Sequence, residues 1–261
     1  MPGTNWIGLW TLITREVGRF FSVYRQTVLP GLISSGLYIL VFGFTLEQRI
    51  AEINGVPYTL FILPGLLMMN TLTNATSNTS SSMLQMKLLQ QLPDILTAPL
   101  SAMEISLAYI IGGTVRGTVN GILVMLLGVI LIDMPVHQPV ATIGFIVMVS
   151  WSFASMGLVL GQLSDSWDQL AMMQNFFLTP LSFLGGIFYS VNMLPDWAQT
   201  LSFFNPIYYM INGIRFTILG VADSPPMTSF SMALIMTIFF TVSAITPVSY
   251  THLTLPTILL V

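Results

Sequence analysis

Three asparagines recur at every fourth position of an uncharged stretch that begins apolar, and they are well placed to meet a polar ligand. Asn70, Asn74 and Asn78 share one face of a helix and lie among threonines and serines. Polar side chains within a membrane helix face other helices or a wet cavity rather than lipid. The spacing therefore predicts either hydrogen bonds between helices or the lining of a substrate path.

Arg116 is the only charge inside a predicted membrane span. That span is expected to enter the bilayer near Gly112, which places Arg116 roughly one helical turn inside the boundary. Its long side chain then either reaches back to the headgroups or binds an anionic substrate.

The remaining reactive residue types form no catalytic or metal-binding pattern. The chain has no cysteine, His137 stands alone in a short predicted loop, and Lys87 does not follow the glycine of a P-loop. No carboxylate falls inside a predicted span, which counts against an ion-coupled carrier, because such carriers usually have one. The sequence also shows no ring of charges and no filter-like loop, which counts against a channel. We therefore expect no enzymatic activity and no cofactor on this chain.

The composition identifies an integral membrane protein. Of 261 residues, 54% are hydrophobic and 7% are charged, whereas soluble domains have roughly a quarter charged residues. The formal charge is −3 and there is no basic run, so nucleic acid is not an expected partner, whereas membrane lipids are. We predict an all-α, polytopic fold with six transmembrane helices, at about residues 28–45, 58–82, 105–132, 139–162, 170–190 and 228–247.

Two segments outside these spans have patterns of their own. From Trp6 to Tyr24, an aromatic stripe opposite arginines predicts an N-terminal amphipathic helix in the membrane interface. From Val191 to Gly220, charges and Asn205-Pro206 interrupt the apolar run, which predicts re-entrant outer helices between spans five and six.

The distribution of positive charge predicts the orientation. The single lysine and most arginines fall on the same side of the membrane as the N-terminus in the predicted topology, whereas Arg49 and Arg215 fall on the other side. Since positive residues favour the cytoplasm, the N-terminus is expected there.

Gly113, Gly117 and Gly121 form a ridge of small residues along the third span. Such a ridge allows another backbone to approach closely. It predicts a packing face, either within the subunit or between two subunits.

The segment from Leu84 to Glu104 separates the second and third spans and predicts a short amphipathic helix outside the bilayer. Pro93 is expected to kink this helix, which ends by Ala98. Leu88, Leu92 and Ile95 share one face, and Gln91 and Asp94 are polar neighbours. The helix either binds a soluble partner or lies on the headgroups.

Several motifs together resemble the type-2 ABC transporter permeases, in the YadH-like inner-membrane branch that includes nodulation lipo-oligosaccharide exporters. The similarity runs from the N-terminal helix to about Thr241. The motifs are QTVLPGLISSGLYILVFG, FILPGLLMMN, LPDILTAPLSAMEI, RGTVNGILV, LTPLSFLGGIFYS and NPIYYMINGIRFTILG.

The resemblance implies a homodimer of six-span subunits in the bacterial inner membrane. Each subunit would dock an ATP-binding cassette ATPase, which holds the ATP and Mg²⁺. Residues 84–99 match the family's cytoplasmic coupling helix. The implied function is export of a substrate, such as an amphiphile, a lipid- or glycan-linked molecule or a drug. The alternative is a membrane scaffold that recruits a soluble factor without transport.

The last residues read differently from the rest of the chain. Val248 to Thr257, VSYTHLTLPT, resembles a translated sequencing adapter. We expect one permease domain over residues 1–247, an artefactual tail at 248–261, and a last span interrupted at Pro247. His252 is therefore not a candidate site.

Overall fold

The chain folds into α-helices joined by short loops and a small β-hairpin. The computed structural model describes residues 5–43, 45 and 52–258, so Arg49 lies outside the described residues. The helices are α1 Trp6–Ser22, α2 Tyr24–Tyr38, the π-helical turn η1 Ile39–Gly43, α4 Tyr58–Leu88, α5 Leu92–Leu96, α6 Ala102–Ile132, α7 Pro139–Leu163, α8 Trp167–Leu184, the 3₁₀ turn η2 Val191–Met193, α9 Asp196–Phe203, α10 Pro206–Leu219 and α11 Pro226–Ile258. The strands are β1 Glu52–Ile53 and β2 Val56–Pro57, which pair antiparallel.

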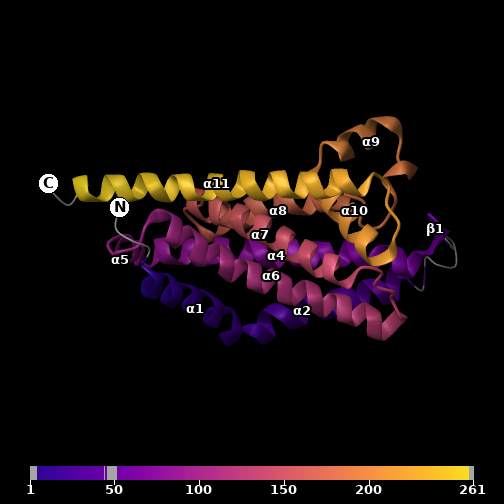
Figure 1. The fold of residues 1–261 in the computed structure, drawn as a ribbon, viewed down its shortest axis with the longest axis horizontal. Coiled ribbons are helices and arrows are strands. Elements are labelled where there is room, and N and C mark those ends of the chain that lie inside the picture. Colours follow the sequence, from indigo (N-terminus) through magenta and orange to yellow (C-terminus); the bar gives the residue numbers. More distant parts are fainter. Residues whose placement is uncertain (1–4, 44, 46–51, 259–261) are drawn as a thin grey trace.

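The helices form an elongated bundle with two distinct ends. Figure 1 shows the start of α1 and the short helix α5 at one end, and β1 and α9 at the other. We call these the α5 end and the α9 end. Three described helical stretches are long and apolar enough to cross a membrane: α6, α7 and residues Pro226–Thr246 of α11. The predicted all-α membrane class is confirmed.

Helix α4 is the centre of the bundle and packs against both α6 and α7. The hydroxyl groups of its polar half donate to backbone carbonyls of α7. Thr76 donates to Phe153 at 3.2 Å, and Thr79 donates to Ala154 at 2.7 Å. The threonines among the asparagines therefore join helices.

The ridge of Gly113, Gly117 and Gly121 lies in the contact of α6 with α4 and α7. A Cβ atom on Gly117 would lie 2.8 Å from both the Ala75 Cβ and the Ser150 Oγ, closer than real Cβ atoms come. The ridge therefore packs within the subunit. Helix α7 presents further glycines to α4, which the sequence pattern did not single out.

The predicted re-entrant segment forms two short helices near the α9 end. Helix α9 has 8 residues and α10 has 14. Helix α10 begins at Pro206, whose missing N–H is harmless in the first turn, and the Asn205 side chain accepts from the Ile207 N–H at 3.0 Å.

Two helices end at other residues than the predicted spans. Helix α8 ends at Leu184 rather than Ser190, because Gly186 takes a left-handed conformation with φ of 82° that breaks the helix. Helix α11 is not interrupted at Pro247 but continues to Ile258. A proline removes one helical hydrogen bond, and the turns on either side of it can continue the helix.

Candidate functional site

The chain between α4 and α6 is divided rather than being one helix. Helix α4 ends at Leu88, Gln90 takes a left-handed conformation with φ of 57°, and α5 begins at Leu92. Pro93 explains the break, because in a continuous helix its ring would clash with the carbonyl four residues earlier. The prediction of a single kinked helix over 84–98 is therefore wrong.

This break separates the residues that were predicted to contact an ATPase. Leu88 is 45% exposed at the end of α4, and Gln91 and Asp94 are exposed. Leu92 is half-buried against the core, and Ile95 is buried within it. Leu88, Leu92 and Ile95 thus do not form one open apolar face, and the assignment of Ile95 as an outward contact is corrected.

A second exposed leucine completes the apolar surface at the end of α4. Leu89, which the helical pattern missed, is 56% exposed. Close to it, the Lys87 ammonium group donates to the carbonyl oxygens of Gln162 at 2.9 Å and Ser164 at 2.7 Å. Lys87 therefore joins the end of α4 to the end of α7. The exposed leucines lie on this end of α4, which the two hydrogen bonds brace against α7.

A capping box at the start of α6 also holds α1. The Ser101 hydroxyl donates to the Glu104 carboxylate at 2.7 Å, and the Asn5 N–H donates to the same carboxylate at 2.8 Å. The hydrogen bond from the Ser101 hydroxyl is the main cause that lowers the pKa of Glu104 below its usual value. An ionised Glu104 therefore joins the beginnings of α1 and α6.

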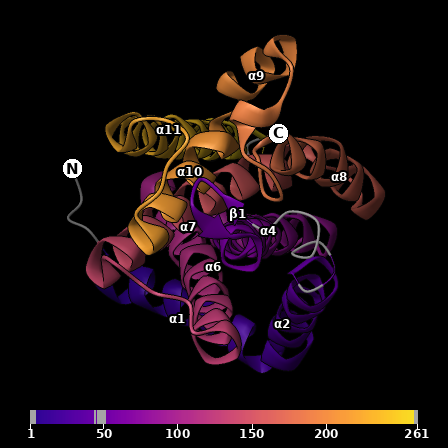
Figure 2. The same ribbon diagram turned by 90° about the vertical axis from the view of Figure 1, so that its right-hand side faces the viewer.

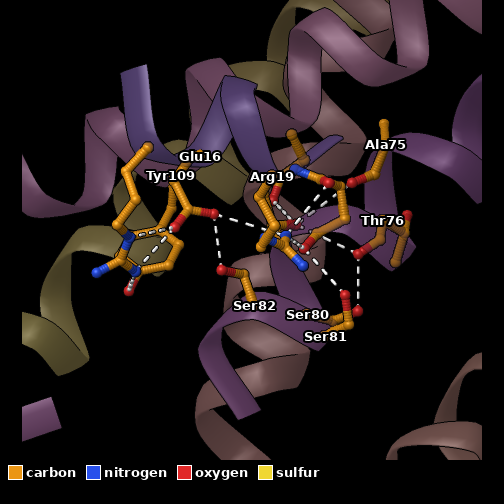
Figure 3. Close-up of polar contacts among 12 residues, drawn as sticks. Glu16, Arg19, Ala75, Thr76, Ser80, Ser81, Ser82 and Tyr109 are labelled. Atoms are coloured by element: carbon orange, nitrogen blue, oxygen red, sulfur yellow. Dashed lines mark hydrogen bonds and ion pairs between the residues drawn. The ribbon is translucent and has the colours of Figure 1, made fainter. Parts of the chain in front are cut away.

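Glu16 of α1 is fully buried and connects three helices (Figure 3). Its carboxylate lies 2.9 Å from the Arg15 guanidinium and 3.5 Å from that of Arg19, and accepts a hydrogen bond of 2.7 Å from Ser82 of α4. Arg15 also donates to the Tyr109 hydroxyl of α6 at 3.4 Å. These contacts hold α1 against α4 and α6. Sequence analysis missed Glu16 because it treated the helix as lying on lipid.

The structure places the four predicted path residues in two different environments. Asn78 is buried beside α1, where its side-chain oxygen accepts from Arg19 at 3.2 Å. Asn70, Asn74 and Arg116 instead line a cavity of about 350 Å³ between α2, α4 and α6. The Arg116 Nε donates to the Asn74 Oδ1 at 3.2 Å. Three of the four residues are thus brought together.

Arg215, which the charge distribution assigned to the outer side, is buried near the α9 end at 1% exposure. Its guanidinium donates to the Gly186 carbonyl at 2.8 Å, lies 3.8 Å from the centre of the Phe61 ring and lies 3.8 Å from the Asp223 carboxylate. Asp223 also accepts from Asn54 at 2.8 Å. This cluster joins the β-hairpin, the loop after α8 and the loop after α10. Sequence analysis did not single out Asp223.

Comparison with known proteins identifies the family. Residues 8–219 match the family model described as ABC-2 type transporter. The inner membrane transport permease YadH of Escherichia coli (strain K12) is 36% identical over 235 residues, which cover 90% of this chain and 92% of YadH. Nodulation protein J of Rhizobium leguminosarum bv. viciae is 28% identical over 238 residues, covering 84% of this chain and 83% of that protein. The resemblance to type-2 ABC permeases is confirmed, and this chain belongs to the ABC-2 type transporter family of membrane permeases.

Proposed function

We propose that the chain is the membrane-spanning subunit of an ATP-driven exporter in the bacterial inner membrane. Permeases of its family normally work with an ATP-binding subunit. The observation that supports the docking site is the exposed pair Leu88 and Leu89 on the braced end of α4. ATP and Mg²⁺ belong to the ATPase, which moves this surface and transmits force along α4.

The proposed topology has six spans and a cytoplasmic N-terminus. The spans lie within α2 with η1, α4, α6, α7, α8 and the first part of α11 at the predicted bounds, so residues 83–88 of α4 and 102–104 of α6 lie outside the membrane. The α5 end is then cytoplasmic, and α9 and α10 form the re-entrant outer segment. The permease domain covers residues 1–247, and residues 248–261 are an artefactual tail. An intact coding run through these residues in an unfragmented clone would contradict this assignment of the tail.

Two copies of the subunit are proposed to form the transport path between them. Figure 2 shows α2 and α8 on either side of α4. Exposed apolar side chains cover α2 and α8, including Leu37 at 56% and Phe176 at 75% exposure. A second copy would cover part of this surface, and the cavity beside Asn70, Asn74 and Arg116 would open toward it. The substrate is proposed to be an amphiphile, a lipid- or glycan-linked molecule or a drug.

Purification from the native membrane in mild detergent tests the ATPase partner. The parent protein is expected to bring a P-loop ATPase with it. Leu88→Asp should weaken that association by roughly tenfold to a hundredfold, because burying one leucine contributes about 1.5–3 kcal/mol. Leu201→Asp is the matched control, since Leu201 is also about half exposed but lies on α9.

The same experiment distinguishes the exporter from a membrane scaffold. Recovery of an ATPase that is lost with Leu88→Asp but kept with Leu201→Asp would support both the function and the docking site. Recovery of a partner without a nucleotide site would instead favour the scaffold. Equal recovery with both variants would show that the ATPase docks elsewhere.

A further inference from the structure

We propose that the cavity at Arg116 binds the anionic headgroup of an amphiphile, whose apolar tail lies along α2 toward the α9 end. This inference deepens the proposed function by naming the chemical class of the substrate and its binding site. Only the transport role of the site rests on that proposed function.

The guanidinium of Arg116 has capacity for a ligand. An arginine has five N–H donors, and the Nε donor of Arg116 is used by Asn74. In the part of the chain that the structure describes, no carboxylate lies within ion-pair distance of Arg116, and no hydrogen bond is made by its terminal nitrogens. A cation away from bulk water is costly without an anion, and two terminal N–H groups suit a phosphate or a carboxylate.

The asparagines hold Arg116 in a defined position. The Asn74 side-chain N–H group donates to the Asn70 Oδ1 at 2.8 Å, so the Asn74 oxygen is turned toward Arg116. Gly31 lets α2 approach at this level, because a Cβ atom there would lie 2.8 Å from the Asn70 Oδ1. The cavity is thus built by three helices around the guanidinium.

A second, apolar cavity continues from the first as an open groove. It measures about 270 Å³ and is lined by Ser34, Leu37, Tyr38, Val41 and Phe42, all of which belong to α2 or η1. Ser34 and Tyr38 line both cavities. Each volume is close to or within the range of roughly 300–1,000 Å³ that is usual for small-ligand sites. A polar cavity with an arginine that continues into an apolar one fits a molecule with an anionic head and an apolar tail.

Binding to the full chain in detergent tests the headgroup. Oleoyl lysophosphatidic acid is expected to bind at least tenfold more tightly than the zwitterionic oleoyl lysophosphatidylcholine. Arg116→Gln should weaken binding of lysophosphatidic acid by roughly tenfold to a hundredfold. Arg25→Gln removes the same charge from an exposed position on α2 and should leave binding unchanged. Equal affinity of the parent and Arg116→Gln, or equal loss in both variants, would overturn the proposal.

A second variant tests the tail independently of Arg116. Ser34→Phe should fill the junction of the two cavities and weaken binding of the oleoyl ligand, while a short-chain phosphate monoester should bind as it does to the parent. Unchanged binding of the oleoyl ligand would overturn the placement of the tail. Inorganic phosphate is expected to bind far more weakly than the oleoyl ligand.

Two sources could supply such an amphiphile, and native mass spectrometry separates them. Retention of phosphatidylglycerol by the purified parent, lost with Arg116→Gln, would identify a bilayer phospholipid. Binding of the single-chain ligand without retained phospholipid would identify a free amphiphile. Binding at Arg116 in a protein that recovers no ATPase would leave the site standing and remove the transport role.

Discussion

At the scale of single residues, the described charges inside the bundle are paired toward its two ends. Glu16 is paired with arginines of its own helix, and Arg215 lies near Asp223 at the α9 end. Arg116 lies between these clusters and has an asparagine as its described side-chain partner. Buried charges need such partners because leaving water is costly. Glu16 and Arg215 therefore have charged partners and support the fold. Arg116 has none among the described residues, so its charge is available to a ligand.

Glu16→Gln is expected to lower the stability of the protein by roughly 1–3 kcal/mol, because it removes the carboxylate that faces two arginines and Ser82. Thermal unfolding in detergent measures the effect as a lower Tm. Asp168→Asn is the control, since Asp168 is exposed and its loss should change stability by less than about 0.5 kcal/mol. Equal Tm values for both variants would contradict a structural role for Glu16.

The lowered pKa of Glu104 predicts that the stability of the folded protein depends on pH in the acid range. Its pKa is lowered in the folded protein, chiefly by the Ser101 hydroxyl, so its stabilising contribution is complete above the unfolded value of about 4.3. That contribution is lost as the pH falls through the lowered pKa. The parent Tm should therefore drop more steeply below about pH 4 than the Tm of Glu104→Gln. Parallel Tm profiles for the two proteins would refute this assignment.

At the scale of elements, helix packing depends on close approach of backbones. Gly113, Gly117 and Gly121 lie where α6 meets α4 and α7, and hydroxyl groups of α4 bond across to α7. In lipid, apolar burial contributes little to helix association, so small residues and hydrogen bonds are used instead.

Gly117→Ala should separate α6 from its neighbours and destabilise the protein by about 1–3 kcal/mol, because the added Cβ would lie 2.8 Å from Ala75 and from Ser150. Gly144→Ala in α7 is the matched control, since nothing lies within 4 Å of the added atom. The control should be neutral or up to about 1 kcal/mol stabilising, as alanine favours a helix. The two Tm values compared in one detergent measure the difference, and an unchanged Tm for Gly117→Ala would be inconsistent with this packing.

At the scale of the whole molecule, the two ends of the bundle have different structures and different proposed roles. The α5 end has the exposed leucines on a braced support, whereas the α9 end has short helices and a buried ion cluster. The cavity at Arg116 lies along the helices between them. An ATPase at the α5 end would therefore act on α4, whose Asn70 and Asn74 line that cavity.

Reporter fusions test the orientation that this division requires. A fluorescent protein fused after Thr241 should fluoresce, and alkaline phosphatase inserted after Asn192 should be active, because these points lie on the cytoplasmic and outer sides of the proposed topology. Phosphatase activity after Thr241, which requires export, would overturn the six-span arrangement.

Much of the fold could be predicted because it depends on patterns local in the chain. The paired helices at 191–220, the small-residue ridge and the polar half of α4 were all visible as spacings of residue types. Helix ends were less predictable. The turn at Gln90 and the end of α8 at Leu184 depend on single backbone conformations that composition does not specify.

The sequence by itself determined that this is a helical membrane protein, because a bilayer demands long apolar helices whose backbone bonds are internal, and its motifs carried the resemblance to the ABC-2 family. Only the tertiary structure decided which polar groups meet. Glu16 and Ser82 are 66 residues apart in the chain, and Asn74 and Arg116 are 42 apart. Their pairing follows from how α1, α4 and α6 pack, so a pattern along one helix could not distinguish Asn78, held by α1, from Asn70 and Asn74, which line the cavity.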